Sequence, residues 1–417
     1  MAESVNYKCP ACGGAMDFDI RTHKLKCQYC DSEFLVDDVA ATKGAKKFNK
    51  DGEFVRKNHF NEPAEPIVRH LAPGDDDSCK YDTYACKQCG GEIKLEPTVI
   101  STICPYCGNN VIFYDKLTGN HVPDLVVPFK VEKKRLRKAY EEHLKFKPFV
   151  PGKFKRENTF ERIKGYYIPF WIYDMKAEGC AVFKAELDQG KNVSVYKVTR
   201  GGTMNFEAIP EDCSKSFDDA MTESLEPFVF NDAIPFETEY LSGFESHVYD
   251  ESCDEGADKA SERAAMSLID SLQKEASRDY SRVTFESDNI KTKDITAQSV
   301  LYPIWMLTTK WDGKEFYFAM NGQTGSFVGN LPRNNVLYFS SITLFSLLLG
   351  WVAYLFLEDL WGGIFAGIIF SVIGHMAVDS SRISVQRARQ ASNYGKPETF
   401  RVNYTDDVYS HSYQRGK

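Results

Sequence analysis

The sequence predicts a multi-domain chain: two tandem N-terminal zinc ribbons, a central α+β domain with duplicated β-meanders, and a C-terminal two-helix transmembrane hairpin. Three observations support this fold class. Eight of the twelve cysteines form C-x-x-C pairs at zinc-ribbon spacing, two long uncharged stretches adjoin near the C-terminus, and the residues between alternate strand and helix patterns. At 417 residues the chain is long enough for two or three domains.

The overall composition excludes several classes of protein. A hydrophobic fraction of 43% and an aromatic fraction of 13% rule out a wholly disordered chain. A mean hydropathy of −0.39 rules out a transporter with many spans. The net charge of −8 argues against a protein that coats nucleic acid, which usually needs a basic face.

The paired cysteines form an internal repeat of a metal site. The two C-x-x-C pairs of a set are separated by segments of equal length, 13–26 and 90–103, and each segment opens with Gly-Gly. Four thiolates close the tetrahedral shell of Zn²⁺ and leave no position for a catalytic water. We therefore expect two structural zinc ions, in ribbons at residues 5–36 and 81–115 joined by a linker at 37–80. The expected ligands are Cys9, Cys12, Cys27 and Cys30 in the first ribbon, and Cys86, Cys89, Cys104 and Cys107 in the second.

A disulfide framework is the alternative for these cysteines. Residues 1–8 carry no signal-peptide pattern, so we expect a cytoplasmic location, where metal binding is favoured over disulfides. A thioredoxin-like pair would need a βαβ context that the sequence lacks. Cys79, Cys180, Cys213 and Cys253 have no partner at metal spacing and are interpreted as ordinary thiols, with the role of Cys79 open because it precedes the second ribbon.

Two uncharged stretches predict the transmembrane hairpin over residues 336–378. As helices, residues 336–357 would extend about 33 Å and residues 361–378 about 27 Å, against a hydrocarbon core of about 30 Å. A buried helical hairpin in a soluble core is the alternative. Arginines flank the pair while the short turn carries only acids, so both termini of a two-pass protein in the cell membrane are expected in the cytoplasm.

The second stretch carries small residues at every fourth position, Gly363, Gly367 and Ser371. Such a stripe lets helices approach closely, either the first span or another subunit in self-association. His375 continues the stripe and is interpreted as a packing or interfacial residue rather than a functional one. The tail at 379–417 shows no apolar periodicity, so a cytoplasmic and partly disordered segment is expected.

The central region, residues 121–332, is expected to be a cytoplasmic α+β domain. An i, i+4 pattern at residues 136–144 and a longer one at 254–280 predict helices. Alternating patterns at 181–187 and 193–199 predict strands that are joined by a turn at 188–190. Pro303-x-Trp305 repeats Pro169-x-Trp171, which indicates two related β-meanders with the long helix between them.

Motifs of catalysis are absent from the sequence. It contains no phosphate-binding loop, no H-E-x-x-H and no G-x-S-x-G, so no catalytic or cofactor-binding residue is predicted. A catalytic site that assembles from distant residues would escape this reasoning.

Several segments resemble a family of bacterial membrane proteins, common in Firmicutes, described as transcription factor IIB-type zinc-ribbon proteins. Many members are named primosomal or replication-restart helicase-like, although this sequence has no ATPase motif. Many have one ribbon, so the second copy departs from the pattern. The family's genes tend to lie near membrane-stress genes, and the resemblance implies a membrane-associated assembly. The segments are the ribbon start at Cys9, Val127–Lys130, Lys164–Trp171, Leu225–Phe228, Tyr240–Gly243, Leu301–Trp305, Asn321–Gly325 and Gly329–Pro332.

The sequence leaves three functions open. The first is a membrane-anchored, non-catalytic scaffold whose partners are the lipid bilayer and other membrane-associated proteins. The second is a membrane-tethered nucleic-acid-binding protein, which the balanced charges of the first ribbon disfavour. The third is an enzyme that uses a pocket of the central domain.

Overall fold

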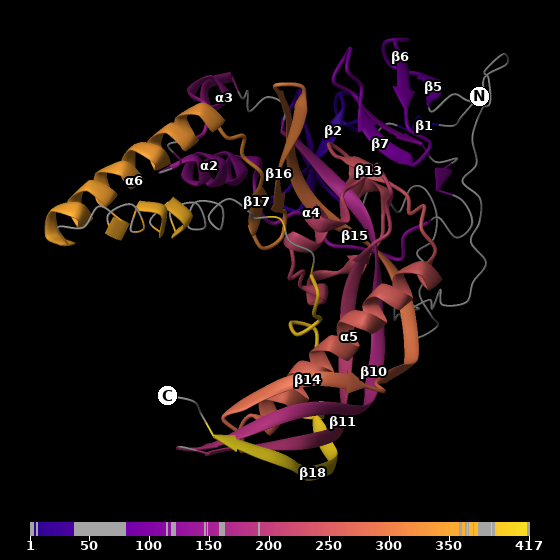
Figure 1. The fold of residues 1–417 in the computed structure, drawn as a ribbon. Helices are drawn as coiled ribbons and strands as arrows, with labels where there is room; N and C mark the ends of the chain where they lie inside the picture. Colours follow the sequence, from indigo (N-terminus) through magenta and orange to yellow (C-terminus); the bar gives the residue numbers. More distant parts are fainter. Residues whose placement is uncertain are drawn as a thin grey trace.

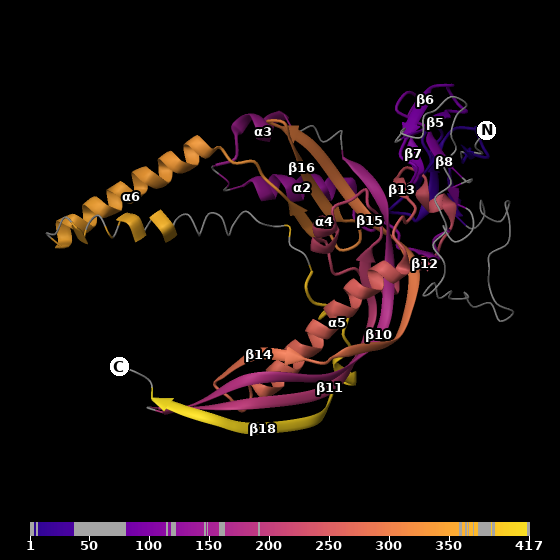
Figure 2. The same ribbon diagram turned by 45° about the vertical axis from the view of Figure 1, so that its right-hand side comes forward.

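The computed structural model describes residues 4–5, 7–36, 81–113, 116–117, 122–145, 147, 149–157, 163–190, 192–357, 361–362, 365, 367–369, 371–373, 385 and 388–414. The expected linker at 37–80, with Cys79, lies outside these residues. Figures 1 and 2 show an open arc, in which helix α6 (Asn335–Leu357) forms one tip. Long curved strands form the other tip, and the N-terminal ribbons lie on the convex side.

The body of the protein, residues 122–332, is built around two long β-hairpins. One joins β10 (Lys164–Gln189) to β11 (Asn192–Asp212), and the other joins β15 (Lys291–Trp311) to β16 (Lys314–Asn321). The strands predicted at 181–187 and 193–199 are the distal parts of β10 and β11. The turn predicted between them is confirmed, with Gly190 at φ +83°, a conformation that favours glycine.

The two hairpins are related by a local two-fold axis between β10 and β15. These strands pair antiparallel, with Ile168 opposite Tyr302. Each of these two residues comes directly before the proline of one repeated motif, Pro169-x-Trp171 or Pro303-x-Trp305. Rotation about the axis therefore exchanges the two motifs, so the repeat seen in the sequence is a repeat of structure.

Each half of the body provides its first strand to the other half. Half 1 comprises residues 125–212 and half 2 residues 245–321. Strand β9 (Leu125–Val126) of half 1 runs parallel to β15, and β13 (Glu245–His247) of half 2 runs parallel to β10. The expected pair of meanders is thus a pair of strand–helix–hairpin units. Their helices are α2 (Lys133–Leu144) and α5 (Cys253–Ala276).

The two tryptophans of the repeat fasten these exchanged segments. Trp171 Nε1 donates to the carbonyl oxygen of Glu251 at 3.0 Å, and Trp305 Nε1 donates to that of Val131 at 2.6 Å. Glu251 lies as many residues beyond the first residue of β13 as Val131 lies beyond the first residue of β9. The two tryptophan hydrogen bonds are therefore equivalent. Aromatic rings also match, because Tyr249 packs on Trp171 as Phe129 packs on Trp305.

Helix α5 confirms the long helix predicted at 254–280. It begins at a capping box, in which Ser252 Oγ accepts from the Glu255 amide and the Glu255 carboxylate accepts from the Ser252 amide. Its buried side is rich in small side chains such as Ala260 and Ala264, so the helix lies close against β10 and β11. The body is completed by α3 (Gly152–Glu157), α4 (Asp219–Ser224), β12 (Ile234–Pro235), β14 (Arg282–Asp288), β17 (Phe327–Gly329) and the 3₁₀ helices Phe230–Asp232 and Thr238–Leu241.

Both ribbons dock on the body. The first ribbon forms a three-stranded sheet of β2 (Met16–Asp19), β3 (Lys24–Cys27) and β4 (Glu33–Leu35), while the preceding strand β1 (Ser4–Val5) pairs with the second ribbon. The described strands of the second ribbon are β5 (Asp82–Ala85), β6 (Glu92–Leu95), β7 (Val99–Ile103) and β8 (Asn110–Phe113). Strand β7 pairs with β13, so the second ribbon extends the 13-stranded main sheet found among the described residues.

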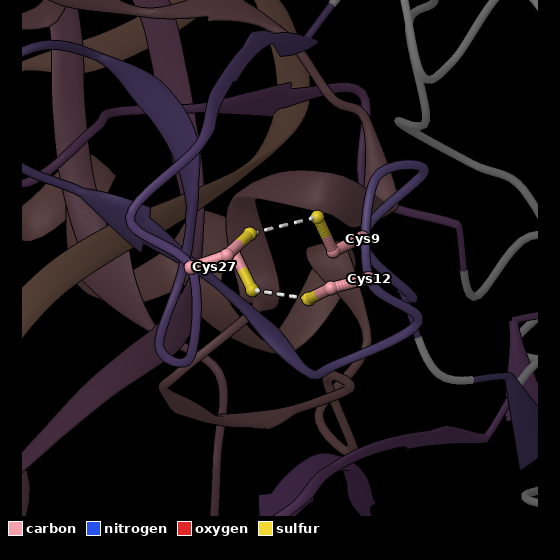
Figure 3. A group of neighbouring side chains, drawn as sticks. Cys9, Cys12 and Cys27 are labelled. Atoms are coloured by element: carbon pink, nitrogen blue, oxygen red, sulfur yellow. Dashed lines mark hydrogen bonds between the residues drawn. The ribbon is translucent and has the colours of Figure 1, made fainter.

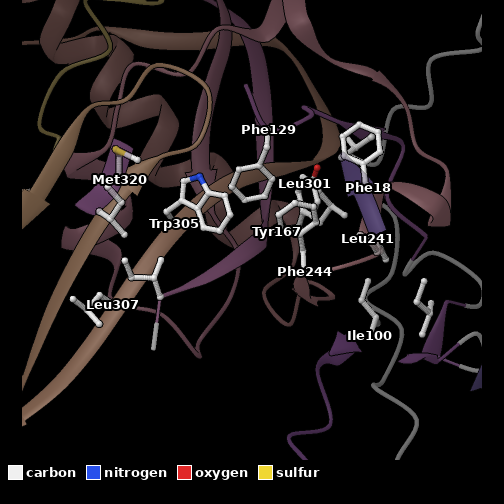
Figure 4. Packing of buried hydrophobic residues seen from close by; sticks show 14 of the residues in the cluster. Phe18, Ile100, Phe129, Tyr167, Leu241, Phe244, Leu301, Trp305, Leu307 and Met320 are labelled. Atoms are coloured by element: carbon white, nitrogen blue, oxygen red, sulfur yellow. The ribbon is translucent and has the colours of Figure 1, made fainter. Parts of the chain in front are cut away.

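The first ribbon shares a hydrophobic core with the body. Figure 4 shows Phe18 of the ribbon in one cluster with Leu241, Phe244 and Trp305 of the body. The Phe18 amide also donates to the carbonyl oxygen of Ser242 at 3.1 Å. The ribbon is therefore part of the folded body rather than a separate module on a linker.

One of the two predicted apolar helices is found in the described part of the chain. Residues Asn335–Leu355 of α6 are apolar and long enough to cross a membrane, and almost all of them stand clear of the body. The first turn is anchored, because buried Tyr338 packs on Phe149 and on the Arg333 guanidinium. The two-helix hairpin itself is not established. Much of 361–378 lies outside the described residues, including Gly363 and His375, although Gly367 lies against Gly350 of α6.

The prediction of a partly disordered tail is wrong for residues 401–414. They form strand β18 (Arg401–Gln414), which follows the 3₁₀ helix Pro397–Thr399. The strand pairs antiparallel with β11, so that Gln414 lies opposite Asn192 and Arg401 lies opposite Thr203. Arg200 of β11 forms an ion pair with Asp407, and buried Ala391 and Tyr394 pack beneath α5. The side chains of β18 are exposed, so the strand is held chiefly by backbone hydrogen bonds, and apolar periodicity does not reveal it.

Candidate metal centres

The first metal centre is formed by two turns of ribbon 1 that face one another. Cys9 and Cys12 lie on the turn before β2, while Cys27 ends β3 and Cys30 lies on the turn that follows (Figure 3). The Sγ atoms of Cys9 and Cys30 are 3.6 Å apart, and those of Cys12 and Cys27 are 3.4 Å apart. All four sulfurs lie within 4.8 Å of one another.

The second centre repeats this arrangement in ribbon 2. Cys86 Sγ lies 3.8 Å from Cys107 Sγ, and Cys89 Sγ lies 3.8 Å from Cys104 Sγ. Ligands about 2.3 Å from a central ion lie about 3.8 Å from one another in a tetrahedron. A disulfide would need an S–S distance of about 2.05 Å, so the described cysteines are not oxidised in pairs. Both groups thus fit a tetrahedral metal ion with four thiolate ligands, and the predicted ligand sets are each brought together.

Backbone hydrogen bonds fix the ligand turns. In ribbon 1 the Cys9 amide donates to the Gly14 carbonyl oxygen at 2.7 Å, and the Gly13 amide donates to the Cys9 carbonyl oxygen at 2.8 Å. In ribbon 2 the Cys86 amide donates to the Gly91 carbonyl oxygen at 2.9 Å, and the Gly90 amide donates to the Cys86 carbonyl oxygen at 2.8 Å. Gly13 has φ +74°, which explains why glycine follows the C-x-x-C pair. The Tyr29 amide faces Cys27 Sγ at 3.4 Å, a contact that stabilises a thiolate.

A tyrosine packs on the first ligand turn of each centre, a role that sequence reasoning missed. The ring of Tyr29 lies over Gly14, where an added Cβ would come within 2.4 Å of it. Tyr106 lies over Gly91 in the same way, with a distance of 2.5 Å. The signal was present in the repeated C-x-Y-C of the second pair of each ribbon. The second glycine of Gly-Gly is therefore required by this close approach, and the first by its backbone angle.

The eight cysteines alternate between buried and exposed positions. The first member of each pair is buried and the second is exposed. Hydrogen bonding with Ser32 lowers the pKa of Cys30 to about 6, which favours the thiolate that a metal ion requires. Cys213 and Cys253 are buried in the core and Cys180 is half-buried on β10, and none of the three belongs to either metal group.

Comparison with curated proteins shows similarity to one bacterial protein. No family model matches the chain, and no solved structure matches it. Over 337 residues the chain is 29% identical to "Uncharacterized protein YdjG" of Bacillus subtilis (strain 168), a match that covers 79% of this chain and 90% of YdjG. A match of 337 residues is too long to rest on the ribbons alone.

Proposed function

We propose that the protein is a membrane-anchored, non-catalytic scaffold whose ribbons and body face the cytoplasm and bind other membrane-associated proteins. The observation that carries the proposal is α6, an apolar helix that leaves the body as an exposed rod while its first turn stays packed on it. A helix rooted in this way holds the body at a fixed orientation to the bilayer, as an assembly platform requires.

Zinc is the proposed occupant of both cysteine groups. Four thiolates in a tetrahedron are the ligand set of structural zinc sites, and a Cys₄ shell leaves no open coordination position. When bound, the ion would link the two turns of each ribbon. It would thereby hold β2 and β3 against the body, and β7 beside β13.

The pairing of β18 supports a two-pass topology. Strand β11 precedes α6 in the chain and β18 follows it, yet the two are neighbours in one sheet. They must lie on the same side of a membrane, so a chain that crosses with α6 crosses back before residue 401. The stretch at 361–378 is the apolar segment in that interval, and its contact at Gly367 with α6 supports a second span. The flanking arginines are the reason to propose that both ends lie in the cytoplasm.

The exposed face of β18 is the proposed contact surface of the scaffold. Tyr404, Val408 and Tyr413 lie on one face of this strand by their register with β11, and each is more than a third exposed. Exposed aromatic and aliphatic side chains are enriched at protein interfaces.

Photo-crosslinking in native membranes tests the scaffold. A photoreactive residue at position 408 of the full-length chain should yield the same membrane-protein adducts in repeated experiments. The matched control places it at Lys274, which is exposed on α5. Identical adducts from both positions, or none from position 408, would contradict the proposal.

A membrane-tethered nucleic-acid-binding protein is the second candidate function. A groove of about 540 Å³ between ribbon 1 and α2 is lined by Arg21, Lys26, Lys133, Lys134 and Arg137. Acidic side chains share this groove, and Arg21 is paired with Glu132 at 3.0 Å, so the net positive charge is small. Fluorescence anisotropy with labelled single-stranded DNA and RNA tests this role. Micromolar or tighter binding that weakens with salt would support it.

A further inference from the structure

A second cavity, of about 480 Å³, lies between ribbon 2 and the body. Its volume is in the range of small-ligand sites. Tyr81 of the ribbon and Tyr317 of the body line it and are each more than a third exposed, so the cavity opens to solvent between them. Its polar lining includes Glu96, Glu245 and His247.

The internal repeat of the body shows that this polarity is not required by the fold. The two-fold axis relates Tyr166 to Val300, and the equivalence of β13 with β9 relates Glu245 to Leu125 and His247 to Val127. Leu125, Val127 and Val300 are buried core residues. Around β9 these positions therefore fill a hydrophobic core, whereas around β13 the equivalent positions carry polar groups beside a cavity.

Carboxylates dominate the charge of the cavity. Glu96 accepts from Ser216 Oγ at 3.0 Å, and Glu245 accepts from Thr102 Oγ1 at 3.2 Å and from Lys164 Nζ at 2.6 Å. Asp218 also lines the cavity, and Lys94 is the one lysine or arginine among the lining residues. Serine and threonine hydroxyls hold the two glutamates in place, so the cavity presents pre-oriented acceptor oxygens.

His247 adds a ring nitrogen, Nε2, that the packing of the protein does not use. The residue is 6% exposed and lines the cavity, and its Nδ1 lies 3.0 Å from Thr98 Oγ1. Burial lowers the pKa of His247 to about 4, so the ring is neutral near pH 7 and adds no positive charge. In the described part of the chain, Nε2 has no hydrogen-bond partner. Because His247 lines the cavity, Nε2 can contact a ligand bound there.

Aromatic rings form the walls between these polar groups. Phe217 lies 5.1 Å from the His247 ring and 5.7 Å from the Tyr166 ring, measured between centroids. Ring faces beside carboxylates are the surroundings in which proteins hold alkylammonium and guanidinium groups, through ion pairing together with cation–π contacts.

We propose that the cavity between ribbon 2 and the body binds a cationic group, an ammonium or guanidinium, that is held by the carboxylates of Glu96 and Glu245 beside the neutral ring of His247. The group belongs either to a free polyamine or to a lysine or arginine side chain of a partner polypeptide. The proposal does not depend on the scaffold function, because a cavity that takes free polyamine would exist whether or not β18 has a partner.

Isothermal titration calorimetry on the full-length chain in detergent micelles tests the proposal. The probes are spermidine, the tripeptide amide Gly-Arg-Gly and its neutral counterpart Gly-citrulline-Gly. Spermidine or the arginine peptide should bind, and the citrulline peptide should bind at least tenfold more weakly. Preference for the peptide identifies a partner side chain as the source, and preference for spermidine identifies a free amine. No heat from either cation, or equal affinity for citrulline, would overturn the proposal.

Three variants locate the site. Glu96→Gln and Glu245→Gln should each weaken binding by roughly tenfold, the effect of one charge-assisted hydrogen bond. His247→Leu, which copies the apolar character of half 1, should weaken it as well. The matched control is Glu141→Gln on α2, whose side chain is exposed and outside the cavity. Each variant is first shown to keep its metal content and its thermal unfolding midpoint. Unchanged affinity in all three would refute the assignment of the site.

Discussion

Replacing Cys27 with serine should destabilise the body as well as ribbon 1. Loss of the ion would release the hairpin that carries Met16, Phe18 and Leu25, which are between 0% and 4% exposed and belong to the core shared with the body. At about 1.5–3 kcal/mol for each buried side chain, this core would lose about 5–9 kcal/mol. Because a whole domain has a stability of about 5–15 kcal/mol, the body itself should be weakened.

Cys104→Ser provides the matched comparison. It removes a ligand of the second centre, whose neighbours Tyr84, Ile93, Val111 and Phe113 form a separate small cluster. Both variants should retain one zinc ion per chain by inductively coupled plasma mass spectrometry, against two in the unsubstituted chain. In urea unfolding followed by the fluorescence of the five tryptophans, which include Trp171 and Trp305 of the body, Cys27→Ser should lower the midpoint more than Cys104→Ser.

Two results would refute this reasoning. If Cys27→Ser loses one ion and leaves the tryptophan transition unchanged, ribbon 1 is independent of the body and the shared core contributes little. If neither variant loses an ion, the cysteine groups are not the metal ligands. A larger shift for Cys104→Ser would instead show that the pairing of β7 with β13 contributes more than the core around Phe18.

Three further predictions follow from particular contacts. Gly14→Ala should weaken zinc binding in a competition assay with a chelating dye, because the new Cβ meets the Tyr29 ring, and the loss should be smaller in a Tyr29→Ala background. Asp407→Ala should cost about 1–3 kcal/mol and speed hydrogen–deuterium exchange in β18, since Arg200 loses an ion-pair partner; unchanged exchange would contradict it. Burial raises the pKa of Glu211 from 4.5 to about 8, so between these pH values the carboxyl takes up a proton on folding. Its contribution to stability is complete below about pH 4.5 and is lost as the pH rises towards 8, so urea midpoints that do not fall across this range would refute it.

The metal centres were predictable because their signal is local. Four cysteines on two short turns can surround one metal ion in any small hairpin. The spacing of Cys9 to Cys30 was therefore sufficient to predict the first centre. Helix α5 was predictable for a similar reason, since its periodicity and its Ser252 cap lie within one segment. The docking of ribbon 1 was not predictable. The sequence alone assigns Phe18 to the core of its own ribbon, and only the structure shows it in one cluster with Phe244 of the body.

Long-range pairing accounts for the features that the sequence did not reveal. Strand β18 pairs with an edge that lies far earlier in the chain, and its exposed side chains carry no pattern that marks a partner. The equivalence of β9 with β13 was hidden as well, because Leu125 and Glu245 share a position in the fold but no chemistry. Isolated His247 gave no signal, since its significance depends on a cavity that ribbon 2 completes.

The exchange of first strands between the two halves has a consequence for how the body came to exist and how it folds. Two separate copies of a half-length chain, exchanging β9-like strands about the same axis, would build this body as a symmetric homodimer. Joining them into one chain fixes their ratio at one to one and frees each copy to diverge. Neither half has a complete sheet alone, so the present chain should unfold as one cooperative unit, as an obligate dimer would, but without any dependence on concentration.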